Sequence, residues 1–206
     1  MKIYRDIIQG TPEWENLRKL HFTATDATAV IARGKGLKTL IKNKLAEYYS
    51  SENYTEYTGK YKDLQMQRGN DMEETARRIY ELETGNSVEQ VGFIETDEYE
   101  GCSPDGLVNE DGLLEIKNHS DPVFIELVLT GKIDSKYTNQ MQMQMYVSNR
   151  KWCDYFAFNP NFSPNFFLKR IYRDEDMMIK IHEGLEEGKT NLKAQKEILD
   201  KMFTKE

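Results

Sequence analysis

Asp105, Glu115 and Lys117 are three residues whose types and spacing suit phosphodiester chemistry. Glu115 and Lys117 stand two apart in the apolar segment GLLEIKNH, and Asp105 precedes them in GCSPDGLVN. Residues two apart in a strand face the same side, so both charged side chains would point together while Ile116 points away. If NEDG at 109–112 turns the chain, Asp105 lies near Glu115. Two carboxylates and one ammonium would then meet at one point.

Such a group fits hydrolysis assisted by a divalent cation. Magnesium binds oxygen ligands, keeps several waters, and takes one or two protein carboxylates together with phosphate oxygens. The cation activates water and offsets charge on the attacking and leaving oxygens. A neighbouring lysine can orient or deprotonate the attacking water, or offset charge at phosphorus. We therefore predict Asp105 and Glu115 as metal ligands and catalytic residues, with Lys117 as their catalytic partner.

The same spacing also fits a hairpin that carries no chemistry. In that interpretation Asp105 caps a turn, and Glu115 and Lys117 form an ion pair on one solvated face of a sheet. A carboxylate followed by Glu-x-Lys recurs by chance in many proteins. Spacing alone therefore leaves both interpretations open.

The bulk composition limits the class of protein. A chain of 206 residues with 38% hydrophobic and 11% aromatic residues is globular, and we predict a single domain over 1–206. Two distant cysteines, Cys102 and Cys153, form neither a metal-ligand pattern nor a disulfide framework. No apolar run approaches the length of a membrane span, and the N-terminus lacks a signal-peptide core. We therefore expect a soluble, cytoplasmic protein with no membrane partner.

Charge is distributed unevenly along the chain. The net charge is −7, yet residues 71–115 hold 14 acidic and 2 basic side chains, whereas residues 1–70 hold 12 basic and 8 acidic ones. The acidic block is either a solvated face or a cation site flanked by segments that meet phosphates. Five basic residues surround one predicted helix and form either a solvated face or a contact with a duplex backbone: Arg33, Lys35, Lys38, Lys42 and Lys44.

The periodicity of apolar residues predicts the elements that position these groups. Helices are expected from Pro12 after the cap Thr11, from Thr25 to about 33, over 37–49, over 70–84 and over 121–129. Strands are expected over 88–96, 101–109, 112–119, 152–160 and 165–173. Residues 137–149 fit helix or strand, and length favours helix. A terminal helix covers about 174–203, with Gly184 and Gly188 as candidate break points. The order predicts a mixed α/β fold with a central sheet.

Four segments, in this order, resemble the phage lambda exonuclease and viral-recombinase branch of the PD-(D/E)xK nuclease superfamily. They are GTPEWENLRKLHFTATDA, GNDMEETARRIYELETG, SPDG followed by LEIK, and YTNQMQMQMYVS, and together they span roughly residues 9 to 160. Each motif alone is weak, but four in the right order are specific. The resemblance implies a restriction-endonuclease-like core, with a central mixed β-sheet flanked by helices.

The resemblance also implies roles for residues near the acid–acid–lysine set. It places Glu73, rather than its neighbour Glu74, at a second metal position, and adds the main-chain carbonyl of Ile116 as a metal ligand. It implies that Arg18 binds the 5′-terminal phosphate. The alternative is a purely structural role, in which Arg18 is a surface arginine that covers Trp14.

Further substrate contacts come from three of the motifs. Thr25 stands where serine is commoner, and Thr23 is a local competitor for its role. Ser103 is a phosphate ligand by resemblance, although turn chemistry alone also explains a serine there. The last motif adds substrate-binding positions at Tyr137, Gln140 and Gln142. On a helix Tyr137, Gln140 and Gln144 share one face, so Gln140 is the better candidate for hydrogen bonds to phosphate or to the lysine. Gln142 lies on another face of the helix, where it could have a structural role or contact the scissile strand.

The implied activity is a Mg²⁺-dependent exonuclease that acts on the ends of linear double-stranded DNA. Such enzymes digest one strand from its 5′ end, release mononucleotides and leave a 3′ overhang. Two Mg²⁺ ions are implied, with Mn²⁺ as a possible substitute. The resemblance further implies a ring-shaped homotrimer, a single-strand annealing protein as partner, and the cytoplasm of a bacterial host cell. The alternatives are a structure- or sequence-specific endonuclease of the same fold and a non-catalytic module that binds DNA ends.

Overall fold

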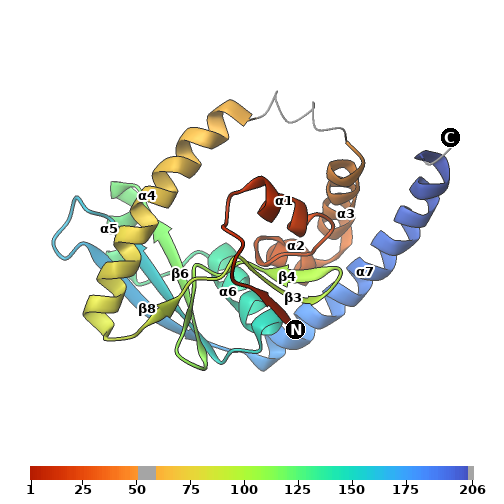
Figure 1. Cartoon of the computed structure of the whole chain (residues 1–206). Coiled ribbons are helices and arrows are strands. Elements are labelled where there is room, and N and C mark those ends of the chain that lie inside the picture. The colour runs from red at the N-terminus through yellow and green to blue at the C-terminus, as the bar shows by residue number, and fades with distance from the viewer. Residues whose placement is uncertain (51–58, 204–206) are drawn as a thin grey trace.

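A computed structural model describes residues 1–50 and 59–203, without the side chains of residues 59–71. Helices and strands follow one another largely as the sequence predicts, and they form a mixed α/β fold. No helix in the described ranges is both long and apolar enough to cross a lipid bilayer. The catalytic candidates lie on the central sheet and on the helices packed against it (Figure 1).

The central sheet has five strands in the order β2-β5-β6-β7-β8. β6 and β7 run parallel, and the other neighbouring strands run antiparallel, so the sheet is mixed as predicted. Its strands are β2 (Val88–Glu89), β5 (Gly106–Val108), β6 (Gly112–Asn118), β7 (Trp152–Phe158) and β8 (Phe166–Tyr172). A second sheet, in the order β1-β3-β4, contains β1 (Lys2–Tyr4), β3 (Phe93–Asp97) and β4 (Glu100–Cys102).

Strand β6 separates two hydrophobic clusters because its side chains alternate between the two faces of the sheet. Leu114 and Ile116 pack with Tyr80 of α4 (Gly59–Thr84) in the smaller cluster, whereas Leu113 belongs to the larger cluster on the opposite face. The larger cluster includes residues of α6 (Ser135–Ser148) and α7 (Glu175–Phe203). Figure 1 shows α4 and α7 on opposite sides of the molecule, with α6 between them. Glu115 and Lys117 share the face of Leu113 and therefore lie on the α6 side.

Two predicted strands are each split between the two sheets. The segment 88–96 divides into β2 and β3, and the segment 101–109 divides into β4 and β5. The first break lies at Gly92, where an added Cβ would come within 2.1 Å of the Ile7 carbonyl oxygen, so the chain crosses the N-terminal segment there. The second break lies at Pro104, which has no N–H to continue a ladder. The prediction of continuous strands was therefore wrong at these two points.

The N-terminal helices confirm one predicted start and correct another. α1 (Pro12–Arg18) begins after Thr11, whose Oγ1 accepts from the Trp14 N–H at 3.3 Å. The second start lies two residues before Thr25, because Thr23 and Asp26 form a capping box in which the Thr23 N–H donates to the Asp26 carboxylate at 2.9 Å. The elements that follow are η1 (Ala24–Asp26), α2 (Ala27–Ala32) and α3 (Gly34–Tyr49).

The terminal helix α7 continues through both glycines at which the sequence suggested a break. A Cβ at Gly184 would lie 2.1 Å from the Val30 carbonyl oxygen, and one at Gly188 would lie 2.8 Å from the Phe22 ring. Both glycines therefore allow α7 to approach the N-terminal helices closely. Close packing here outweighs the low helix propensity of glycine, which costs about 1 kcal/mol relative to alanine.

Candidate active site

The β5–β6 hairpin places Asp105 beside Glu115. Gly106 pairs with Leu114 in this ladder, so the two acidic residues stand at adjoining positions on neighbouring strands. Oδ2 of Asp105 accepts a hydrogen bond from the Ile116 N–H at 2.6 Å. This bond fixes the aspartate against β6, as the sequence predicted from the turn at 109–112.

The carboxylate of Glu115 is held on both oxygens by helix α6. Gln140 Nε2 donates to Oε1 at 2.7 Å, and Gln144 Nε2 donates to Oε2 at 2.7 Å. Lys117 Nζ forms an ion pair with Oε1. Glu115 is 1% exposed, and Gln144 is completely buried. Gln140 therefore joins the site through Glu115, where the sequence analysis had expected Lys117 or a phosphate as its partner, and Gln144 is a further residue of the site.

The spacing of the glutamines on α6 contained the signal for Gln144. Positions 140 and 144 are four apart and share a helical face, whereas position 142 lies on another. Accordingly, Gln142 Nε2 donates to the Tyr172 carbonyl at 2.8 Å, and its Oε1 accepts from the Asp174 N–H at 3.0 Å. Gln142 thus ties α6 to the end of β8 and not to the acidic residues.

We predict that Gln144→Met lowers both stability and turnover, whereas Gln142→Met lowers stability only. The first change leaves a buried oxygen of Glu115 without its donor, which costs about 1–3 kcal/mol, and it frees the carboxylate to move. Urea unfolding and steady-state digestion of linear duplex DNA test this, with kcat expected to fall and KM to stay constant for Gln144→Met. Equal kcat values for the two variants would remove the positioning role of Gln144.

Lys117 is only partly exposed and lies beside an aromatic ring. Its Nζ is 5.3 Å from the ring centroid of Tyr137, near the start of α6. Burial disfavours the ammonium, but the negative charges of Glu115 and Asp105 outweigh burial and raise the pKa of Lys117. The charged form is therefore favoured, which suits a hydrogen-bond donor that offsets negative charge.

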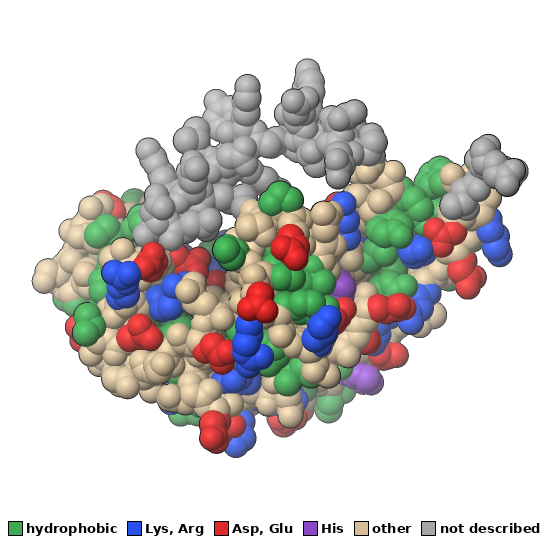
Figure 2. Space-filling model, viewed as in Figure 1, with side chains coloured by type: hydrophobic (Ala, Val, Ile, Leu, Met, Phe, Trp, Pro, Cys, Tyr) green, Lys and Arg blue, Asp and Glu red, His purple; other side chains and the backbone are tan. Residues whose placement is uncertain are grey.

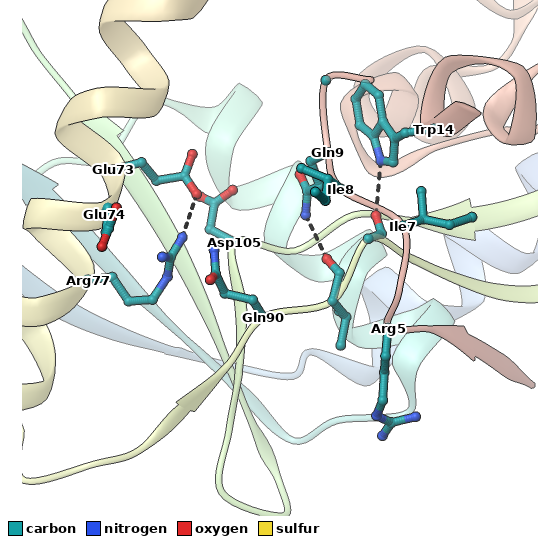
Figure 3. A pocket seen from close by; sticks show the side chains of 13 residues that line it. Arg5, Ile7, Ile8, Gln9, Trp14, Glu73, Glu74, Arg77, Gln90 and Asp105 are labelled. Atoms are coloured by element: carbon teal, nitrogen blue, oxygen red, sulfur yellow. Dashed lines mark hydrogen bonds and ion pairs between the residues drawn. The ribbon is translucent and has the colours of Figure 1, made fainter. Parts of the chain in front are cut away.

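Glu73 of α4 points toward Asp105, and both side chains line a cleft of about 510 Å³ (Figure 3). Burial raises the pKa of Glu73, although Arg77 donates to it at 2.8 Å. Burial raises the pKa of Asp105 well above its usual range, and the charges of Glu115 and Glu73 add to this effect. Glu74, next to Glu73, also lines the cleft, but it is exposed and pairs with Arg78 one turn along the helix. Glu73 is therefore the glutamate whose carboxylate lies beside Asp105.

The donors in this cleft fit a hard divalent cation in their chemistry. Asp105 and Glu73 present carboxylate oxygens to one space, and burial is the largest cause of the raised pKa of each. Over the described ranges, however, no three Asp, Glu, His or Cys side chains converge closely enough to form a complete metal cage. Asp105 and Glu73 thus form a pair of carboxylates in the cleft, and Glu115 lies beside Asp105 on the neighbouring strand. This is consistent with magnesium, which takes few protein ligands.

A second group of polar side chains runs from Ser103 to the start of η1. Trp14 Nε1 donates to Ser103 Oγ at 2.9 Å, and the guanidinium of Arg18 lies 3.9 Å from the Trp14 ring centroid. Arg18 Nη2 donates to Thr23 Oγ1 at 3.5 Å, and Thr23 Oγ1 lies 3.1 Å from Thr25 Oγ1. The structure therefore joins Arg18, Ser103 and Thr25 through Trp14 and Thr23, and Thr23 makes the direct contact with Arg18.

Arg18 covers Trp14, as expected for a surface arginine, but its side chain is half-buried. Its Nε is buried and has no hydrogen-bond partner among the residues that the structure describes. Burial lowers the pKa of this guanidinium, and acidic residues such as Asp26 only partly offset the effect. A half-buried guanidinium whose Nε–H has no hydrogen-bond partner among the described residues is suited to bind an anion.

The basic cluster of residues 33–44 is partly paired within the protein. Lys44 Nζ lies 2.7 Å from Asp26 Oδ2, and Arg33 Nη1 lies 3.3 Å from Glu183 Oε2. Figure 2 shows acidic and basic side chains mixed over the visible face and not separated into one basic stripe. Lys44 thus supports the N-terminal fold, and this face offers no continuous basic track.

Comparisons with known proteins agree with this geometry. A family model described as a YqaJ-like viral recombinase domain matches residues 13–151, a range that contains every candidate site residue. None of the curated proteins matches the chain.

Among solved structures, an alkaline exonuclease from Laribacter hongkongensis is 30% identical, with a TM-score of 0.79 over 95% of this chain and 99% of that one. The same enzyme in complex with dAMP is 32% identical, with a TM-score of 0.77 and the same coverage of 95% and 99%. A phage-related exonuclease from Haemophilus somnus 129PT is 16% identical, with a TM-score of 0.58 over 89% and 98% of the two chains, which shows the fold alone. These neighbours confirm the predicted PD-(D/E)xK core.

Proposed function

Because the chain belongs to the YqaJ-like viral recombinase family, we propose that it is a Mg²⁺-dependent exonuclease that degrades linear duplex DNA from the 5′ end. The observation that carries the proposal is the convergence of Asp105, Glu115 and Lys117 on the β5–β6 hairpin, next to a cleft that Glu73 also faces. The likeness to an alkaline exonuclease over nearly the whole chain supports the same reaction class.

The proposed roles follow from where each donor lies. Asp105 and Glu73, which lie side by side in the cleft, would hold the cation together with Glu115 and the main-chain carbonyl of Ile116. When bound, a magnesium ion supplies an activated water and offsets charge on the phosphoryl oxygens. Lys117 would donate a hydrogen bond to the attacking water or to a phosphoryl oxygen, because its neighbours favour the ammonium form. Gln140 and Gln144 would keep Glu115 in one orientation.

Polarity would come from the buried group around Arg18. A 5′-terminal phosphate carries more charge than an internal diester, and a guanidinium fork matches its oxygens. Ser103 and the hydroxyls of Thr23 and Thr25 would complete this site. Because Ser103 precedes the Pro104–Asp105 pair, a bound 5′ phosphate would lie close to the catalytic residues.

Digestion of end-labelled linear duplex, with and without a chelator, tests the proposed function. We expect mononucleotide release from the 5′-labelled strand, loss of release with chelator, and no attack on covalently closed circular DNA. Cleavage of the circle would favour an endonuclease of the same fold. Binding to ends without hydrolysis in Mg²⁺ or Mn²⁺ would favour the non-catalytic module.

We predict that Arg18→Ala removes the preference for 5′-phosphorylated ends over 5′-hydroxyl ends. Hydrogen bonds between charged partners are worth about 1.5–3 kcal/mol, which corresponds to roughly a 10- to 150-fold loss in the ratio of kcat/KM values. Arg5→Ala is the control, since Arg5 lines the cleft but pairs with Glu89 at 2.6 Å. The role fails if Arg18→Ala keeps the parental ratio.

The proposal extends to assembly and partner. A ring of three chains around the duplex would keep the enzyme on its substrate, and the 3′ overhang would be handed to a single-strand annealing protein. Family membership supports this part. The molar mass in solution, compared with 24.2 kDa for one chain, tests the trimer directly.

A further inference from the structure

A second hollow, of about 340 Å³, opens near Lys117 and shares no lining residue with the cleft of Asp105 and Glu73. The end of β6, helix α5 (Asp121–Thr130), the α5–α6 connection and the start of α6 form its walls. Tyr137 lines the hollow, and its ring also lies 5.3 Å from Lys117 Nζ. Tyr137 therefore connects the hollow to the catalytic set.

Three rings of the hollow lie close to one another. The centroids of His119 and Tyr137 are 5.8 Å apart, and those of Tyr137 and Tyr155 are 5.9 Å apart. His119 Nε2 and Tyr155 Oη are hydrogen-bonded at 2.6 Å, which fixes the imidazole against the buried tyrosine. Val123 and Leu127 of α5 add an apolar wall. Such a lining accepts a flat aromatic ligand, since every base has a face that stacks on an aromatic side chain.

Positive charge accompanies these rings. Lys136 Nζ lies 4.7 Å from the ring centroid of Tyr137, so this ring has an ammonium group near it from Lys136 as well as from Lys117. Lys132 also lines the hollow, as do the acidic residues Glu126 and Asp134, and Lys136 Nζ lies 3.7 Å from Asp134 Oδ2, so a bound phosphate would compete with Asp134 for Lys136. An anion bound beside Tyr137 would therefore meet lysine donors while an attached ring lay against the aromatic floor.

We infer that this hollow binds one nucleotide, with the base against Tyr137 and the phosphate near Lys136 and Lys117. The volume falls within the range of small-ligand sites, about 300–1,000 Å³. The inference rests on the proposed function, since it places a nucleotide next to the catalytic lysine. The nucleotide comes either from the strand that is being digested or from the released deoxynucleoside monophosphate.

Filling the hollow from α5 tests the inference with a matched control. Val123 lines the hollow and is 49% exposed, whereas Val128 on the same helix is 50% exposed and lies outside the lining. Val123→Trp should weaken nucleotide binding by about 5- to 150-fold, the range expected for one stacked base, and Val128→Trp should leave it unchanged. Lys136→Glu, at a side chain that is 60% exposed, provides a second variant that does not crowd the helix and should weaken binding as well.

Binding is read from the fluorescence of 2-aminopurine, in chelator so that no strand is cut. One arm uses 5′-phosphorylated duplex with the analogue at each of the first positions of the 5′ strand, and the other uses free 2-aminopurine deoxynucleoside monophosphate. A change that depends on Val123 and Lys136 in the duplex arm identifies the strand as the source. The same dependence in the free-nucleotide arm alone identifies the product. Both results support the site.

The inference is overturned if Val123→Trp and Lys136→Glu match the parent chain in both arms. This outcome is separate from failure of the proposed function. If the proposed function fails, the parent chain will not digest linear duplex DNA in Mg²⁺, whether or not a nucleotide binds in the hollow.

Discussion

Lys117→Met should lower kcat on linear duplex DNA by about 10²–10⁴-fold, the range typical for loss of one positioned proton donor or acceptor. Methionine keeps most of the apolar stem but removes the ammonium that pairs with Glu115. Duplex binding in chelator should be largely retained, because the anion site around Arg18 is unchanged. A filter-binding or anisotropy titration, together with single-turnover digestion, separates the two effects.

Removing this lysine also leaves a buried carboxylate without its cation, so stability needs its own control. Lys189→Met is matched to it: Lys189 is 14% exposed and lies 3.0 Å from Asp97, and it also pairs with the buried Glu100. Both variants should unfold at lower urea concentration than the parent chain, but only Lys117→Met should lose turnover. Wild-type kcat in Lys117→Met would rule out the assigned role of the lysine.

The centre of the site is readable from sequence because its geometry is local. Asp105 and Glu115 are only ten positions apart. One tight turn sets the register of the two strands, and the alternation of side chains along each strand sets the face on which a residue lies. Arg18 and Trp14 are likewise four apart on one helix, so their stacking follows from helical spacing. Elements of this kind are fixed by the chain over short distances, and the structure reproduces them.

The contacts that complete the site depend on how distant elements pack. Gln144 reaches Glu115 across 29 positions, and Trp14 reaches Ser103 across 89. Periodicity showed that Gln140 and Gln144 share a face of α6, but not that this face lies over β6. For the same reason, Pro104 can indicate a break in the segment 101–109, but it does not indicate that the two halves join different sheets.

The acidic block of residues 71–115 is neither wholly a solvated face nor wholly a cation site. Glu74 is exposed and pairs with Arg78, as a solvated residue would. Glu73 and Asp105 instead lie close enough to Glu115 that, in addition to burial, its charge raises the pKa of both. Composition located the excess of acid, and only the fold separates the carboxylates that face the cleft from those that face water.

Asp105→Asn should raise the stability of the metal-free protein at neutral pH while it lowers kcat by at least about 10²-fold, since changes even to residues behind a metal ligand cost 10- to 100-fold. Burial and the charges of Glu115 and Glu73 raise the pKa of Asp105 in the folded chain. The folded state therefore binds this proton more tightly than the unfolded state, whose aspartate has a pKa of about 3.9. The free energy of unfolding consequently falls as pH rises from that value through the higher folded-state pKa.

Asparagine removes this charge and can still accept the hydrogen bond from the Ile116 N–H. The stability gap between Asp105→Asn and the parent should thus grow as pH rises from acid to neutral. The control is Asp97→Asn, with the opposite sign: burial disfavours that carboxylate, but the Tyr99 N–H and Lys189 outweigh burial and lower its pKa, so its loss should destabilise the protein at neutral pH.

Magnesium should reverse the order of the parent and Asp105→Asn, because a cation that binds only the folded state stabilises it by about 2.7 kcal/mol at a concentration 100 times its Kd. The parent chain should gain this stability in Mg²⁺, and Asp105→Asn should gain much less. Thermal unfolding of both proteins at two pH values, with Mg²⁺ and with chelator, gives all the comparisons at once. An equal gain of stability in Mg²⁺ for the two proteins would mean that the carboxylates of the cleft do not hold the cation. The link between their raised pKa values and a metal site would then fail.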